Sequence, residues 1–174
     1  YLRGRHFLAR RNADGMKKSV GYFQDTIRTD PQYAPAYSGL AVAYDLLGTY
    51  EVLPPNESFP KAKEFANQAL QLDDTLAEAY TARGMATFFW ELNWSAAGWD
   101  FQRAVALDPS FALAHHWYAE YWIGIGSAGS ALAEMKRARE LDPLSLAING
   151  TLGRVYRDAG QYEEALHQCR QTVD

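Results

Sequence analysis

Hydrophobic residues follow a helical spacing along almost the whole chain. Alanine, leucine and aromatic residues recur at steps of three and four positions, which gathers them on one face of a helix. Helices of about 12–15 residues account for this spacing. No stretch alternates hydrophobic and polar positions as a half-buried strand does. The pattern therefore predicts an all-α fold.

The helical pattern also repeats. Four segments align without gaps, and they are 29–44, 72–87, 107–122 and 141–156. Alanine-centred segments alternate with them at 19–27, 61–70, 97–105, 130–139 and 164–172. An Asp-Pro pair near the start of three aligned segments ends the preceding helix, because the residue before a proline disfavours helical geometry. Gly48, Gly126 and Gly160 lie where one helix of a pair must turn into the next. Each unit is therefore predicted to hold two helices.

A unit of about 34 residues, with two helices and small residues where they touch, is typical of the tetratricopeptide repeat. The chain resembles tetratricopeptide repeat proteins over essentially its whole length. This resemblance implies a right-handed α-solenoid of about five helix-turn-helix repeats in a single array over 1–174. The expected repeats are approximately 1–32, 33–75, 76–110, 111–144 and 145–174.

A narrower resemblance is to the repeat arrays of bacterial winged-helix transcription regulators, Ser/Thr kinases and nucleotide cyclases. It is carried by YLRGR (1–5), DPQYAPAYSGLAVAY (30–44), VLPP (52–55), LDDTLAEA (72–79), HWYA (116–119) and LDPLS (141–145). In those arrays the effector chemistry lies in another domain. Because the chain begins with Tyr1 and not with Met, we expect it to be part of a longer protein.

The second repeat is longer than the others. Pro54 and Pro55 disfavour a helix, so an exposed insertion loop is predicted over 49–60. One interpretation is a family-typical insertion that packs its hydrophobic residues locally, and the other is a loop that contacts a partner.

Composition and charge narrow the function. The 174 residues are 48% hydrophobic and 22% charged, which is ordinary for a globular chain. No hydrophobic run approaches the roughly 18 residues of a membrane span, so no membrane partner is expected. Cys169 is the single cysteine, which fits a reducing compartment and a cytoplasmic location. We expect it to be a small buried hydrophobic residue of a helix.

The net charge of −4 argues against a general nucleic-acid binder. Residues 1–28 nevertheless carry seven Lys and Arg against two Asp. This basic first hairpin is either a solvated or docking surface, or an auxiliary nucleic-acid site whose binding would weaken steeply with salt.

His115, His116 and Glu120 raise the question of a metal site. His116 and Glu120 are one helical turn apart and could supply two metal ligands. A zinc site needs three or four protein ligands, however, and the other histidines, His6 and His167, lie in distant repeats. We therefore expect no metal and no cofactor. The sequence also holds no nucleophile–base–orienter set and no glycine-rich phosphate loop. No enzymatic activity is predicted.

The resemblance implies that one stripe of the first helices of the repeats lines a concave groove. The residues expected there are Thr81, Met85, Phe88, His116, Glu120, Ile123, Arg154 and Arg157. A hydrophobic middle with acidic residues and an arginine end suits an amphipathic helix or an extended peptide that bears an acidic group. The Lys and Asn that chaperone-binding members use for a C-terminal carboxylate are absent from this stripe, so that ligand is not expected.

The sequence thus predicts a non-catalytic protein-interaction or regulatory module of a larger bacterial signalling or transcription-regulator protein. It would bind a partner peptide in the groove, or an attached effector domain. The alternative is a small-molecule sensor that uses the same groove, with the ligand between Phe88, His116 and Trp117.

Overall fold

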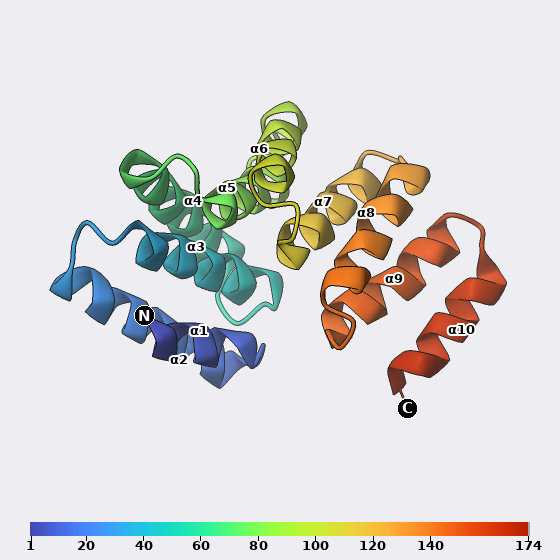
Figure 1. Cartoon of the computed structure of the whole chain (residues 1–174), viewed down its shortest axis with the longest axis horizontal. Coiled ribbons are helices and arrows are strands. Elements are labelled where there is room, and N and C mark those ends of the chain that lie inside the picture. Colours follow the sequence, from blue (N-terminus) through green and yellow to red (C-terminus); the bar gives the residue numbers. More distant parts are fainter. Residues whose placement is uncertain (174) are drawn as a thin grey trace. The chain divides into compact units, whose positions relative to one another are not determined.

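The computed structural model describes residues 1–173, which form ten helices and no strand (Figure 1). In chain order the helices are α1 (Leu2–Ala9), α2 (Ala13–Thr29), α3 (Ala34–Thr49), α4 (Pro55–Leu72), α5 (Ala77–Phe89), α6 (Trp94–Leu107), α7 (Ala112–Gly124), α8 (Ala128–Leu141), α9 (Leu146–Asp158) and α10 (Tyr162–Val173). Consecutive helices pack as antiparallel pairs, one pair in each predicted repeat. The all-α prediction is confirmed.

The same side-chain contact to a proline carbonyl recurs in three of the turns between repeats. The Tyr37 hydroxyl donates to the Pro31 carbonyl at 3.1 Å, and the Asn149 amide donates to the Pro143 carbonyl at 2.8 Å. His115 occupies the same position, with its Nε2 3.1 Å from the Pro109 carbonyl oxygen. In each case a side chain from the first turn of the next helix reaches back six residues. The Asp-Pro turn is therefore held by a side-chain hydrogen bond as well as by the restricted backbone of proline.

The loop predicted over 49–60 is shorter in the structure. Helix α3 continues to Thr49 and α4 begins at Pro55, so only five residues connect them. Pro55 occupies the first helical position, where its missing N–H leaves no hydrogen bond unmade. Pro60 lies inside α4, where it removes one helical hydrogen bond. The neighbouring Phe59 is 5% exposed and stacks on Phe89 with ring centroids 6.0 Å apart, and this burial favours the helix despite Pro60.

The chain divides into two compact units, unit 1 (1–107) and unit 2 (108–174). Within unit 1, two glycines let the helices approach Phe23, since a Cβ at Gly4 or Gly39 would lie 2.7 Å from its ring. Gly84 is likewise packed against Phe101. Whether the repeats of the two units form the single array that we predicted stays a prediction.

Unit 2 has its own core. It is built on Met135, Ile148, Leu152 and Val155, all from α8 and α9, with alanines of α7 and α8. The expectation that Cys169 is buried was wrong, since it is exposed on α10. Its sulfur still borders the core, because a Cβ at Gly153 would lie 3.0 Å from it.

Candidate functional site

The eight predicted groove residues belong to both units. Unit 1 holds Thr81, Met85 and Phe88 on α5, and unit 2 holds His116, Glu120 and Ile123 on α7 with Arg154 and Arg157 on α9. A strip that joins the two units stays a prediction.

In unit 1, the expected surface is largely buried. Thr81 and Met85 are both 0% exposed, and the Thr81 hydroxyl donates to the Ala77 carbonyl at 2.9 Å. The expectation of an exposed Met85 was therefore wrong. Helix α3 lies alongside α5, and Val42, which aligns with Met85 in the repeat of α3, is also buried. Phe88 is half-buried, with its ring edge-on to Phe89.

A polar cluster that the sequence analysis missed ties together the first helices of three repeats. Glu78 on α5 accepts a hydrogen bond from Ser38 on α3 at 2.7 Å and forms an ion pair with Arg5 on α1. Burial lowers the pKa of Arg5, but the charge and hydrogen bond of Glu78 outweigh it and raise the pKa overall. The side chain of Glu78 is only 14% exposed. We therefore interpret this cluster as a structural contact that joins α1, α3 and α5.

A second missed residue is Asp45 on α3. It aligns with Phe88, Ile123 and Arg157 of the predicted stripe, but it is 0% exposed. Neither carboxyl oxygen has a hydrogen-bond partner among the described residues. Burial raises the pKa of Asp45 well above its ordinary value, because the charged form would lose its contact with water.

In unit 2, the predicted residues form one polar group on α7 and α9. Arg154 forms an ion pair with Glu120, whose Oε1 lies 4.0 Å from Nε2 of His116. The same His116 nitrogen is 3.3 Å from the hydroxyl of Thr151. His116 is 3% exposed, so it lies beneath the other polar residues and is not accessible to a partner. The side chains of Arg154 and Glu120 are 42% and 15% exposed and form its accessible part.

The other two predicted residues of unit 2 border this group. Ile123 is half-buried and packs against the core of the unit. Arg157 is exposed and pairs with the adjacent Asp158. The face of α7 and α9 therefore offers two exposed guanidinium groups, one carboxylate and one partly covered hydrophobic side chain.

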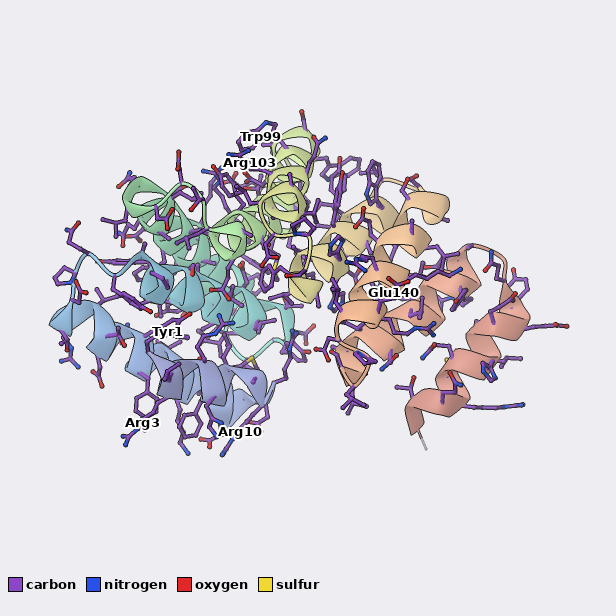
Figure 2. All side chains as sticks on the ribbon, viewed as in Figure 1. Tyr1, Arg3, Arg10, Trp99, Arg103 and Glu140 are labelled. Atoms are coloured by element: carbon purple, nitrogen blue, oxygen red, sulfur yellow. The ribbon has the colours of Figure 1, made fainter. Side chains whose placement is uncertain are left out.

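The basic first hairpin consists of α1 and α2. Arg3 on α1 and Arg10, which follows the last residue of α1, are exposed (Figure 2). On α2, Lys18 and Arg28 form ion pairs with nearby aspartates. What this hairpin binds stays a prediction.

Two further features bear on the chemistry. Within residues 1–173, no group of three or more His, Cys, Asp or Glu side chains is placed to hold a metal ion. In the same part of the chain, no helix combines the length and the hydrophobicity needed to cross a bilayer.

Comparison with known proteins identifies the fold. No protein-family model matches the sequence. Superkiller protein 3 of Schizosaccharomyces pombe is 25% identical over 199 residues, which covers 95% of this chain but 14% of that protein. The chain therefore spans a small part of this relative.

Three solved structures are similar in fold. TTC0263 of Thermus thermophilus, described as a thermophilic TPR protein, has a TM-score of 0.76 at 19% identity, over 98% of this chain and 86% of that one. MamA has a TM-score of 0.59 at 22% identity, over 98% and 92%. YrrB, described as a TPR protein with an unusual peptide-binding site, has a TM-score of 0.59 at 20% identity, over 92% and 78%. With its paired helices and aligned repeats, the chain has the all-α tetratricopeptide-repeat fold.

Proposed function

We propose that the chain is a non-catalytic protein-interaction module that binds a partner peptide on the α7–α9 face of unit 2. The observation that carries this proposal is the Arg154–Glu120 ion pair, which lies partly exposed above the buried His116 and the half-buried Thr151. Two side chains that already pair with each other and pack on a buried residue are pre-organised for recognition, since they lose little conformational entropy on binding.

The favoured partner is an extended or helical peptide with an acidic side chain. Arg154 and Arg157 are exposed cations one turn apart on α9, and arginine binds carboxylates through paired hydrogen bonds. Ile123 supplies a hydrophobic contact beside them. The likeness to YrrB, described as having a peptide-binding site, supports a peptide as the ligand.

We further propose that this module belongs to a larger bacterial regulator, whose activity lies outside the 174 residues. The sequence segments that resemble the arrays of winged-helix regulators, kinases and cyclases support this context. The small-molecule alternative is less favoured, because His116 and Trp117 are only 3% and 4% exposed and offer little accessible surface to a ligand.

A selection from a phage-displayed library of random peptides tests the proposal. The enriched peptides would be synthesised and their affinities measured by calorimetry for the wild-type chain, Arg154→Ala and Arg137→Ala. Arg137 is a matched control, since it is 47% exposed and pairs with Glu140 on α8, outside α7 and α9. We expect Arg154→Ala to weaken binding by about 1–2 kcal/mol and Arg137→Ala to leave it unchanged. Equal affinities for the three proteins would exclude this face as the binding site.

A further inference from the structure

Unit 1 exposes an unusual amount of aromatic surface around the turn from α5 to α6. Trp90, Trp94 and Trp99 are 44%, 49% and 55% exposed, and Leu92 between them is 68% exposed. Single exposed hydrophobic residues are common, but clustered ones mark interaction sites, and tryptophan is enriched among the residues that dominate binding energy. None of these residues belongs to the predicted groove stripe.

Two of the tryptophans border adjoining hollows beside α4, the first against the end of α5 and the second against α5 and α6. The first, of about 370 Å³, is lined by Trp90 with Phe59 and Pro60 of α4. The second, of about 400 Å³, is lined by Trp99 with Arg83 and Thr87 of α5. Both hollows share Lys63, Asn67 and Glu91 as a common wall. We call the pair of hollows the α4–α6 groove.

The walls of the groove are held in place by side-chain contacts. Arg83 donates to Asp100 through Nε and Nη2, with distances between 2.6 and 3.2 Å. Its guanidinium also lies over the ring of Tyr80, and Tyr80 meets Trp99 edge-on at 5.8 Å. On the shared wall, Lys63 pairs with Glu91 at 2.5 Å. The groove is therefore formed before a ligand arrives, which lowers the entropic cost of binding.

The groove has a carboxylate at one end and a cation one helical turn beyond the other. At the Trp90 end, Glu64 is exposed and accepts only a 3.3 Å hydrogen bond from Gln68 among the described residues. Arg103 lines neither hollow, but it is exposed on α6 one turn after Trp99, which borders the second hollow (Figure 2). No ion pair within residues 1–173 engages Arg103. The remaining charged groups of the groove compensate one another as ion pairs.

We propose that the α4–α6 groove is a second protein-docking surface, separate from the α7–α9 face. Its occupant is a segment of another protein with two hydrophobic side chains, one for each hollow. A basic residue of the segment lies beside the first hydrophobic side chain, near Glu64, and an acidic residue lies beyond the second, near Arg103. The tryptophans supply the hydrophobic contact, and the two end charges fix the direction in which the segment lies.

An array of short synthetic peptides tests this inference on the full chain. Each peptide holds two leucines joined by a variable polar spacer, with Lys or Glu at each end in all four combinations, and a matched set has serine in place of leucine. Binding is followed by fluorescence anisotropy for the wild-type chain, Trp90→Ala, Trp99→Ala and Arg103→Glu. Tyr162→Ala is the control, since Tyr162 is an aromatic residue of α10 with 67% exposure. Circular dichroism of each variant checks that it folds.

We expect a peptide with opposite end charges to bind most tightly and its serine counterpart not to bind. Each tryptophan variant should weaken that peptide roughly tenfold or more, and Arg103→Glu should shift the preference at one end from Glu to Lys. Tyr162→Ala should have no effect. The inference is overturned if no leucine peptide binds below about 1 mM, or if folded Trp90→Ala and Trp99→Ala bind as tightly as the wild type. Saturation of the groove by free indole without peptide binding would instead assign it to a small molecule.

Discussion

The buried carboxyl group of Asp45 should make the protein less stable as pH rises. The substitution Asp45→Asn tests this expectation. Asp45 is 0% exposed and lacks a hydrogen-bond partner among the described residues. Its charged form would therefore lie in the protein interior without compensation. Burial raises its pKa well above the value of 3.8 for an exposed aspartate, whereas the unfolded chain leaves the same carboxyl in water.

The size of the effect follows from proton linkage. Below the pKa of the unfolded chain, both states hold the proton and Asp45 causes no pH dependence. Between that pKa and the raised pKa of the folded state, the folded protein keeps one proton that the unfolded chain has released. The free energy of unfolding then falls as pH rises, by about 1.4 kcal/mol for each pH unit. Above the folded pKa the loss stops. An asparagine at this position does not titrate, so the variant lacks this slope.

Urea denaturation followed by circular dichroism measures the effect at a series of pH values from about 5 to 8. The difference in unfolding free energy between Asp45→Asn and the wild type should grow in favour of the variant by about 1.4 kcal/mol per pH unit until the folded pKa is passed. Asp74→Asn is the control, because Asp74 is exposed in a turn, and its curve should run parallel to that of the wild type.

A constant difference between Asp45→Asn and the wild type across this range would refute the reasoning. It would mean that Asp45 is ionised in the folded protein, and therefore that water or a cation reaches it.

Three other substitutions test the packing. Phe101→Ala should lower the free energy of unfolding by roughly 3–5 kcal/mol, because Phe101 is 0% exposed against Gly84; a loss below about 1 kcal/mol in urea denaturation would contradict its place in the core. Ala138→Trp should destabilise by about 1–3 kcal/mol or more through overpacking of a fully buried site, and an unchanged melting temperature would show that the helices pair differently. Arg83→Met should cost about 3–5 kcal/mol, since it leaves Asp100, with a 5% exposed side chain, without its partner. Stability close to the wild type would mean that solvent reaches Asp100.

The sequence by itself determined the helices and their repeat. Hydrophobic spacing and Asp-Pro pairs act within a few residues, so they specify where a helix lies and where it ends without knowledge of distant contacts. Pro31, Pro109 and Pro143 mark three of the turns, and the structure places helix ends beside them. The partition of the candidate site into α5, α7 and α9 was also predictable, because helical periodicity places residues on a face.

Only the tertiary structure decided which residues of that face are accessible. Met85 and Asp45 occupy positions that the repeat pattern assigns to a groove, and the neighbouring helices bury both. Pro60 inside α4 and the contact of Arg5 with Glu78 were also decided by packing. The physical reason is that exposure and pairing depend on side chains that lie tens of residues away, and the volume that those side chains fill is set by how closely small residues such as Gly39 and Gly84 let the helices approach.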